Sequence, residues 1–460
     1  MDETRARPID PEGEDDEDGS GAPTIPHAEP AGVSSPAEEE GGPLRRLLAL
    51  LGPGLITGAS DDDPSGIGTY TTAGASLGFA TLWTAVVTLP LMAAVQFVCA
   101  KIGMVSGRGL AGVLRHHYPR WVLYAAVLLL SVANTINAGT DIGAISAAVN
   151  LIVPALPVKL MIVPVALAIV VLQIRCSYRL IANAFKWLSL TLFAYIAAAF
   201  LARPHWGEVL RDTFVPHLSL DAQYLSTLVA ILGTTISPYL FFWQASEEVE
   251  EEVQMGRTKL REREGATRKE LRHAALDTLA GMLFCNVVFY FVILASAATL
   301  HASGKTDVQS ATDAARALEP FAGPAAKYLF ALGLVGAGFL AVPVLSGSAA
   351  YAVAETFGWK YGLDSKPHQA KQFYAVIAVS TAVGMLINFA GVNPISALFW
   401  TAVINGLLSP PLLVLIMLVS NNREVMGEHT NGRLVNALGW AAAAIMVAAA
   451  AGMILTWNQQ

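Results

Sequence analysis

Long apolar segments recur along most of the chain, with short polar stretches between them. Eleven of these segments hold about 20 residues or more, a length that spans the hydrocarbon core of a bilayer as an α-helix. A soluble protein would show shorter runs with a polar face on each helix. The pattern therefore predicts an all-α integral membrane protein. Its eleven predicted spans lie near residues 47–75, 81–105, 121–150, 155–174, 180–202, 222–249, 273–299, 325–356, 370–391, 395–420 and 434–457.

Two of the predicted spans are interrupted by polar residues and a proline. The first reads LLGPGLITGASDDDPSGIGTYTTAG, in which Asp61–Asp63 and Pro64 fall about halfway across. The sixth reads LVAILGTTISPYLFFWQ and is interrupted at Ser237-Pro238. Proline disfavours helix at the residue before it and removes a backbone donor. Both spans are therefore predicted to be broken helices.

The spacing of the two breaks predicts an internal symmetry. The broken spans are the first and the sixth, and an odd offset reverses the direction of a helix in the membrane. Two five-helix halves of inverted topology, each opening with a broken helix, are typical of a secondary transporter with its site near the bilayer midplane. Spans 1–5 and 6–10 are then the repeats, and span 11 is peripheral.

The composition agrees with this architecture, and it distinguishes the N-terminal residues from the rest of the chain. Hydrophobic residues make up 54% of the 460 residues and charged residues only 14%, against about 25% charged in a soluble domain. Residues 1–43 hold 13 of the 36 acids but only Arg5 and Arg7 among the bases, a balance of −11. This segment lacks the apolar surface needed to fold, so we expect residues 1–43 to be a disordered acidic tail and residues 44–460 the transmembrane domain.

The distribution of positive charge predicts the orientation. On one side of the predicted membrane lie 22 of the 29 lysines and arginines, on the other side six, and Lys186 falls inside a span. Positive charge stays cytoplasmic, so the N-terminus is expected inside and, with eleven spans, the C-terminus outside. We expect a multi-pass protein of the plasma membrane, the inner membrane if the source is bacterial, in contact with lipid and not with nucleic acid.

The interrupted first span carries the strongest candidate chemistry. Asp63 before Pro64 reads as a helix N-cap, but at this depth in an apolar span a charge costs at least ~2.5 kcal/mol, and one cap does not require three acids. Unwound backbone at that depth must line a cavity or be covered by protein. Carboxylates and freed carbonyls are the hard oxygen ligands that suit a cation, so a cation site is favoured over a purely structural cap.

Other buried polar positions leave alternatives open. Asp141 in the third span could relay protons or line an ion path, and it could equally pair with Asn134, Asn137 or a backbone amide. Glu247 and Glu248 are candidates for an inner vestibule, whereas the acids that follow them to Glu252 are expected at a solvated helix end. The three widely spaced cysteines show no zinc-type spacing or disulfide framework and are expected to be buried small hydrophobes.

These landmarks resemble the Nramp family of proton-coupled divalent-metal transporters. The similarity extends from about residue 47 to 440 and rests on the order and spacing of several segments. They are LGPGLITGASDDDPSG, LWTAVVTLPLMAAVQFVCAKIGMVSGRGLAGVLR, ILGTTISPY, LEPFAG and MLVSNNREVMGEHTNGRLVNALGW. The resemblance implies a leucine-transporter-type fold and alternating access, with a divalent cation of the Mn²⁺, Fe²⁺ or Mg²⁺ class as substrate, protons as a candidate coupling ion, no cofactor and no enzymatic activity.

The resemblance also implies a ligand set, from which this sequence departs. The family's Asp-Pro-Gly-Asn break, whose Asp and Asn ligate the metal, corresponds to Asp63-Pro64-Ser65-Gly66, so the Asn is replaced by Gly66. The family's Met-Pro-His break, with a sulfur ligand, corresponds to Ser237-Pro238-Tyr239, and the ligating carbonyl falls on Thr234. A second family histidine falls on Gln244, and one register places Asn137 and Thr140 at the family's acidic pair in span three.

The resemblance therefore predicts a site made of Asp63, Gly66, Thr234 and Ser237, with Asp62 beside them. Asp61, Asp141, Tyr239, Gln244 and Glu247 are the candidates for the pathway or for coupling. Loss of the thioether and of the bulky amide makes the site harder and wider, which suits an ion that keeps several waters, such as Mg²⁺. The Nramp-related magnesium transporters resemble this chain in lacking that soft ligand. In the simpler alternative, Ser237 only packs or caps a half-helix and the ion binds elsewhere, for instance around Asp61 and Asp62.

Two other functions remain as rivals. A carrier of the same fold could take amino acids or another organic solute, although three aspartates would repel a substrate carboxylate. An intramembrane aspartyl protease could use Asp63 and Asp141 as a dyad sharing one proton, but a Gly-x-Gly-Asp signature is absent and Asp63 precedes a proline.

Overall fold

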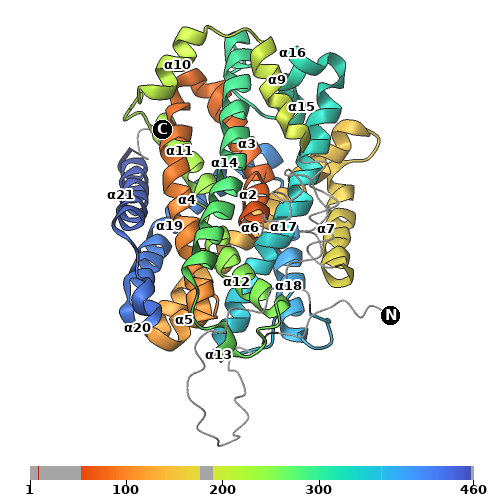
Figure 1. The fold of residues 1–460 in the computed structure, drawn as a ribbon. Coiled ribbons are helices and arrows are strands. Elements are labelled where there is room, and N and C mark those ends of the chain that lie inside the picture. Colours follow the sequence, from red (N-terminus) through yellow and green to blue (C-terminus); the bar gives the residue numbers. More distant parts are fainter. Residues whose placement is uncertain (1–8, 10–52, 177–189, 364, 457–460) are drawn as a thin grey trace, which may run out of the picture.

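The computed structural model describes Ile9 and residues 53–456, apart from 177–189 and 364, and over this part of the chain it is a helical bundle without named strands (Figure 1). The helices of the first half are α2 (Pro53–Asp61), α3 (Pro64–Leu77), α4 (Trp83–Ser106), α5 (Leu110–His117), α6 (Arg120–Ile152), α7 (Val158–Arg175), α9 (Ala194–Leu201) and α10 (Trp206–Phe214). Those of the second half are α11 (Ala222–Thr235), α12 (Pro238–Gln254), α13 (Leu260–Arg263), α14 (Arg268–Thr299), α15 (Ala311–Ala315), α16 (Glu319–Ala322), α17 (Ala326–Phe357), α18 (Lys371–Ile387), α19 (Pro394–Asn421), α20 (Arg423–Met426) and α21 (Arg433–Thr456).

The predicted spans are found as helices wherever the structure describes them. Nine helical stretches within the described residues are long and apolar enough to cross a membrane. The first predicted span is the pair α2 and α3, each too short to cross alone, and the fifth is described only over Leu190–Leu201. The all-helical membrane class is thereby confirmed, whereas the count of eleven remains a prediction. The predicted domain boundary and nearly all of the acidic tail lie outside the described residues.

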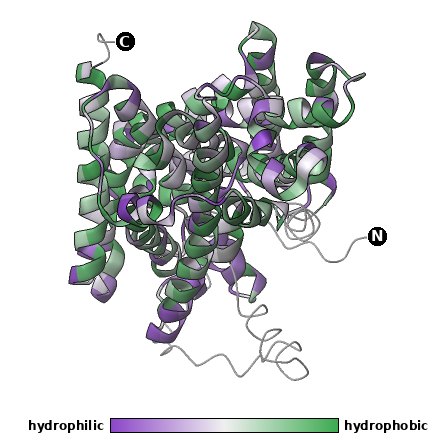
Figure 2. Cartoon of the chain, turned by 90° about the horizontal axis from the view of Figure 1, so that it is seen from above, coloured by the Kyte–Doolittle hydropathy of each residue, from purple (hydrophilic) through white to green (hydrophobic). Residues whose placement is uncertain are grey.

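The outer surface of the bundle is apolar, as a membrane-embedded surface must be. Large side chains such as Leu128, Leu160 and Leu386 are 60% or more exposed, far more apolar surface than a soluble protein leaves uncovered. Hydropathy colouring shows hydrophobic residues on the peripheral helices as well as inside the bundle (Figure 2). Lipid is therefore the natural environment of these faces.

The two broken helices run through the interior of the bundle. The α2 and α3 halves both pack along α14, α3 also contacts α19, and α12 packs between α4 and α17. At one such contact, a Cβ placed on Gly58 would lie 2.2 Å from the carbonyl oxygen of Gly281, so only glycine allows α2 to lie this close to α14. The short helices α5, α13 and α20 lie at one end of the bundle, and α10, α15 and α16 lie at the other (Figure 1).

Candidate cation site at the two helix breaks

The first break is built around the carboxylate of Asp63. This residue adopts an extended conformation, with φ −68° and ψ 165°, and caps α3 by accepting a 2.6 Å hydrogen bond from the Gly66 backbone N–H. The Ser65 hydroxyl lies 2.8 and 2.9 Å from the two carboxylate oxygens. Pro64 occupies the first helical turn, where its missing N–H costs nothing. The prediction that Asp63 caps a helix is thus correct as local geometry. The capping hydrogen bonds orient the carboxylate but supply no positive charge to balance it.

The second break ends α11 at Thr235 and begins α12 at Pro238. Ser237 precedes the proline, and its hydroxyl lies 2.9 Å from the Gly233 carbonyl oxygen and 2.8 Å from that of Thr234. The hydroxyl therefore donates back to carbonyls that the end of α11 leaves unpaired. This contact matches the simpler alternative of the sequence analysis, in which Ser237 caps a half-helix. The Thr234 carbonyl keeps a second lone pair for another partner.

The two breaks face each other across the position of Gly66. A Cβ placed on Gly66 would lie 3.1 Å from the Thr234 hydroxyl oxygen and 3.3 Å from an Asp63 carboxylate oxygen. The Thr234 hydroxyl is buried and has no hydrogen-bond partner among the described residues. Any larger side chain at position 66 would thus fill the space that separates Asp63 from Thr234.

Direct hydrogen bonds also join the half-helices α2 and α12. The Tyr239 hydroxyl donates to the Ser60 carbonyl oxygen at 3.1 Å, and the Thr57 hydroxyl lies 2.6 Å from the side-chain oxygen of Gln244. Gln244 in turn donates to Glu248 at 2.8 Å. Tyr239, in the first turn of α12, and Gln244, about two turns beyond the break, thus tie α2 to α12.

The third predicted span, helix α6, supplies one side chain to Asp63 and places a second beside it. The Asn137 amide donates to an Asp63 carboxylate oxygen at 3.1 Å, while Asn134 donates to the Leu345 carbonyl oxygen at 2.9 Å. Asp141 is fully buried and feels the charge of Asp63. Neither asparagine binds Asp141, and the donor that acts on its carboxylate is the Ser65 backbone N–H. Of the partners considered for Asp141, the backbone amide is therefore the one that the structure places beside it.

Asp61 and Asp62 lie on the side of the break that faces α14. The Cys285 thiol donates to one oxygen of Asp61 at 3.2 Å, and the other Asp61 oxygen is buried without a partner among the described residues. One oxygen of Asp62 is likewise buried without a hydrogen-bond partner among the described residues. From the sequence, Cys285 was expected to be only a buried small hydrophobe. The local sequence does not predict that this position of α14 contacts Asp61.

Within the described part of the chain, no basic side chain neutralises this group of carboxylates. The charges that act on Asp61 and Asp62 come from the neighbouring aspartates. The only buried basic residues in the described part of the chain are Lys101 and Arg263, which bind Asn431 and the Gly107 and Thr258 carbonyls respectively. Buried carboxylates without such a partner require protons or cations for neutrality.

The acids at the end of α12 differ from the expectation. Glu247 is half-buried, but Glu248, Glu250 and Glu252 are 4–6% exposed, so the predicted solvated helix end is wrong. Glu250 accepts a 2.7 Å hydrogen bond from the Leu363 backbone N–H. The connection between α17 and α18 folds over this helix end and covers it, a long-range contact that the local sequence does not reveal.

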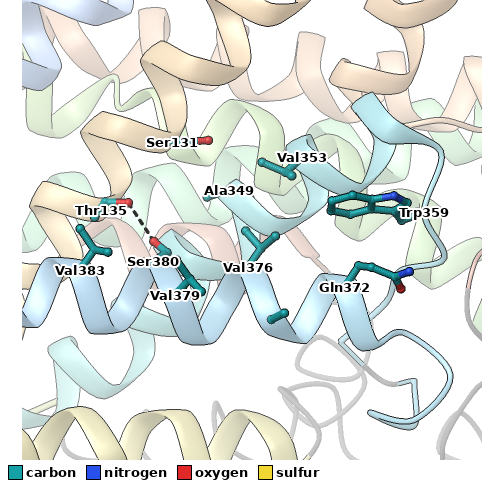
Figure 3. A pocket seen from close by; sticks show the side chains of 11 residues that line it. Ser131, Thr135, Ala349, Val353, Trp359, Gln372, Val376, Val379, Ser380 and Val383 are labelled. Atoms are coloured by element: carbon teal, nitrogen blue, oxygen red, sulfur yellow. Dashed lines mark hydrogen bonds between the residues drawn. The ribbon is translucent and has the colours of Figure 1, made fainter.

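The described residues contain no cluster of three or more histidine, cysteine, aspartate or glutamate side chains arranged to hold a metal ion. A cation at the breaks would therefore depend on Asp63 together with backbone and hydroxyl oxygens. A pocket of about 410 Å³ lies elsewhere, between α6, α17 and α18 (Figure 3). It is mostly apolar, holds the Thr135–Ser380 hydrogen bond of 3.0 Å, and includes none of the candidate site residues.

Comparison with known proteins places this geometry in context. The sequence model of the family described as natural resistance-associated macrophage protein-like (Nramp) matches residues 54–456. The divalent metal cation transporter MntH of Klebsiella pneumoniae (strain 342) is 27% identical over 409 residues, covering 87% of this chain and 92% of that protein. MntH 1 of Pseudomonas aeruginosa is 26% identical over 455 residues, covering 95% and 97%.

Two solved structures share the arrangement of helices. The manganese transporter of Eremococcus coleocola superposes with a TM-score of 0.69 at 19% identity, over 91% of this chain and 88% of that chain. Mhp1, a nucleobase-cation-symport-1 family transporter in a closed conformation, superposes with a TM-score of 0.55 at 15% identity, over 89% and 93%. The predicted leucine-transporter-type fold with two broken helices is confirmed by these matches.

Proposed function

The chain belongs to the Nramp family, and we propose that it is a secondary transporter that moves divalent metal cations across a membrane by alternating access. The observation that carries this proposal is the pair of facing helix breaks around Asp63, a buried carboxylate with no basic partner among the described residues. A charge at such a depth is retained where it serves an ion pathway. The metal is the substrate of this process, and no resident cofactor or covalent step is required.

The first ligand that we propose is Asp63, with the Thr234 carbonyl as the second. Ser65, Gly66 and Asn137 hold the Asp63 carboxylate by hydrogen bonds, so its lone pairs are oriented before an ion arrives. Each carboxylate oxygen has more than one acceptor position, which leaves room for a cation beside these donors. Ser237 can add a hydroxyl oxygen by turning away from the Gly233 carbonyl. The negative charge of Asp62, next to Asp63 in the chain, adds to the attraction for a cation.

The absence of a side chain at Gly66 bears on the selectivity that we propose. Oxygen ligands, with no side chain at position 66, favour a hard cation that keeps part of its hydration shell, as Mg²⁺ does. Mn²⁺ also accepts oxygen ligands, whereas Cd²⁺ gains more from sulfur. We therefore propose that Mg²⁺ and Mn²⁺ compete for one site and that Cd²⁺ binds poorly.

Proton coupling is proposed to involve Asp141. Its carboxylate is buried next to Asp63 and has no basic partner in the described part of the chain, and a cation arriving at Asp63 would favour loss of a proton from this neighbour. Tyr239 and Gln244 replace the two histidines of the family pattern, so they cannot take up a proton near neutral pH. Asp61 and Glu247 are the remaining candidates along the path.

We further propose that the basic end of the bundle, with α5, α13 and α20, is cytoplasmic. The N-terminus would then be inside and the C-terminus outside, in a plasma membrane, the inner membrane in a bacterium. The relatives of this chain named MntH are bacterial.

The organic-solute carrier is the remaining rival, since Mhp1 shares the fold. The three adjacent aspartates favour a cation over an anionic solute. The protease rival is not favoured, because the relatives of this chain are named as divalent metal cation transporters.

Uptake by purified protein in proteoliposomes tests the proposal. Labelled Mn²⁺ should accumulate, and unlabelled Mn²⁺ and Mg²⁺ should compete, whereas a mixture of amino acids should not. Uptake of amino acids with no response to either metal would replace the proposed function by the rival.

A further inference from the structure

An open groove on the outside of the bundle runs along α18. It is the pocket of about 410 Å³ between α6, α17 and α18. Two of its lining residues, Val379 and Val383, are 61% and 49% exposed, so the groove opens on the apolar face that the membrane covers. Most of its lining consists of small or branched apolar side chains, namely Ala349, Val353, Ala375, Val376, Val379 and Val383.

The groove is about as deep as one leaflet of a bilayer. Its lining residues on α18 extend from Gln372 to Val383, a rise of about 16 Å along the helix. This length is roughly half of the ~30 Å hydrocarbon core. Figure 3 shows Trp359 and Gln372 at one end of the groove and Val383 at the other. The groove thus has the length and the apolar lining that suit a single acyl chain lying along α18.

The end of the groove at Trp359 lies at the end of the bundle that carries α5. Glu355, in the last turn of α17, accepts 2.9 Å hydrogen bonds from the backbone N–H groups of Gly109 and Gly112 at the start of α5. Trp359 follows soon after and stacks on Phe357, with ring centroids 5.0 Å apart. Tryptophan is enriched at the membrane–water interface, so this end of the groove, its mouth, is at the level of the lipid headgroups.

Two exposed lysines flank the mouth of the groove. Lys360 directly follows Trp359 in the chain. Lys371 lies one turn before Ala375, on the same ridge of α18 as the groove lining. It stands at the first position of α18, where the helix dipole disfavours a positive charge, so helix stability does not account for it. Residues 360–371 hold three lysines and one aspartate, which makes this connection net positive.

We propose that the groove binds one anionic phospholipid of the phosphatidylglycerol type, with an acyl chain along α18 and the headgroup phosphate between Lys360 and Lys371. The apolar lining offers few partners to a polar solute, and the two lysines favour a negatively charged headgroup over a zwitterionic one. Because the lipid contacts α6, α17 and α18 together, its binding stabilises the packing of these three helices. The site requires a membrane-embedded bundle and is independent of the transported ion.

Native mass spectrometry of the purified protein tests this selectivity. The protein is mixed in detergent with phosphatidylglycerol or with phosphatidylcholine of the same acyl chains. The first bound lipid should bind about tenfold more tightly when it is phosphatidylglycerol. Lys360→Gln/Lys371→Gln should remove this difference, because both headgroup contacts lose their charge, and Lys360→Arg/Lys371→Arg should keep it.

The matched control is Arg261→Gln/Lys269→Gln, which removes two exposed charges from α13 and the start of α14. This variant should bind both lipids as wild type does. Equal affinity of the wild-type protein for the two lipids would overturn the proposal, and so would an unchanged preference in Lys360→Gln/Lys371→Gln.

Tryptophan fluorescence tests the position of the lipid. Lipids brominated on their acyl chains quench nearby indole rings, and the difference between wild type and Trp359→Phe isolates the contribution of Trp359. Brominated phosphatidylglycerol should quench this contribution at concentrations where brominated phosphatidylcholine does not. Ala375→Phe, which fills the groove from an exposed position, should abolish the quenching although both lysines remain. Quenching of Trp359 that is equal for the two lipids, or that persists in Ala375→Phe, would place the lipid elsewhere and contradict the proposal.

Discussion

The side-chain amide of Asn137 lies 3.1 Å from a carboxylate oxygen of Asp63 and donates a hydrogen bond to it. This contact links α6 to the first helix break, so α6 helps to hold the carboxylate of Asp63 in place. The Asn137 amide oxygen is buried and has no partner among the described residues. It is thus a free acceptor on the same amide group that orients Asp63.

Removal of this amide should weaken cation binding without abolishing it. A hydrogen bond to a charged group is worth about 1.5–3 kcal/mol, and Ser65 and Gly66 still hold Asp63 in the variant, so Asn137→Ala should raise the apparent KM for Mn²⁺ roughly tenfold. Asn134→Ala, which removes an equally buried amide of the same helix, is the matched control. Equal effects of the two substitutions on KM would argue against a specific role for Asn137.

The space at Gly66 gives a second prediction. A Cβ at this position would crowd the Thr234 hydroxyl and Asp63 at 3.1 and 3.3 Å. Gly66→Ala should therefore reduce uptake of Mg²⁺ more than that of Mn²⁺, because a narrower site forces the ion to shed water and Mg²⁺ dehydrates reluctantly. Gly66→Asn adds an amide ligand as well and should partly restore Mn²⁺ alone. Competition curves for both ions check this, and an unchanged Mg²⁺-to-Mn²⁺ ratio in both variants would contradict it.

Much of this architecture follows from the sequence. Apolar run length locates the spans, and the proline after Asp63 and after Ser237 locates both breaks, because these are local properties of the chain. The contacts of Cys285 with Asp61 and of Thr57 with Gln244 are not local. They depend on how each helix is rotated about its axis, which hydropathy does not fix when a helix is apolar on all sides.

A contact between distant parts of the chain also explains why one expectation was wrong. The acids near the end of α12 resemble a solvated helix end, yet Glu250 is enclosed by a connection more than 100 residues away in the chain. The backbone N–H of Leu363 decides the environment of Glu250, and a single sequence holds no record of such a pairing.

Ser237 separates two accounts of the second break. If its hydroxyl serves the ion, Ser237→Met should strengthen inhibition by Cd²⁺, which favours sulfur, more than inhibition by Mg²⁺. If it only caps the Gly233 and Thr234 carbonyls, the order of potency should not change. We expect the former, measured as inhibition of labelled Mn²⁺ uptake by Mg²⁺, Mn²⁺ and Cd²⁺. Ser237→Ala controls for loss of the cap alone, and an unchanged order in Ser237→Met would show that residue 237 does not touch the ion.

The orientation can be tested with single introduced cysteines. Pro30→Cys should react with an impermeant thiol reagent only from the cytoplasm and Gln460→Cys only from outside, since 22 of 29 basic residues lie on the predicted inner side. Native Cys176, which is half-buried, would first be replaced by serine. Labelling of both positions from the same side would imply an even number of spans and contradict the inverted repeat.

The central claim is that Asp63 binds the transported cation and does not serve only as a helix cap. Asp63→Asn separates these roles, because asparagine caps a helix about as well as aspartate but lacks the charge. Asp221→Asn, at the N-cap of α11, makes the same change where no ion is proposed. Uptake of labelled Mn²⁺ into proteoliposomes should fall to the background of empty vesicles in Asp63→Asn and stay at the wild-type rate in Asp221→Asn, with both proteins equally stable in detergent. Wild-type uptake by a folded Asp63→Asn protein would contradict the account.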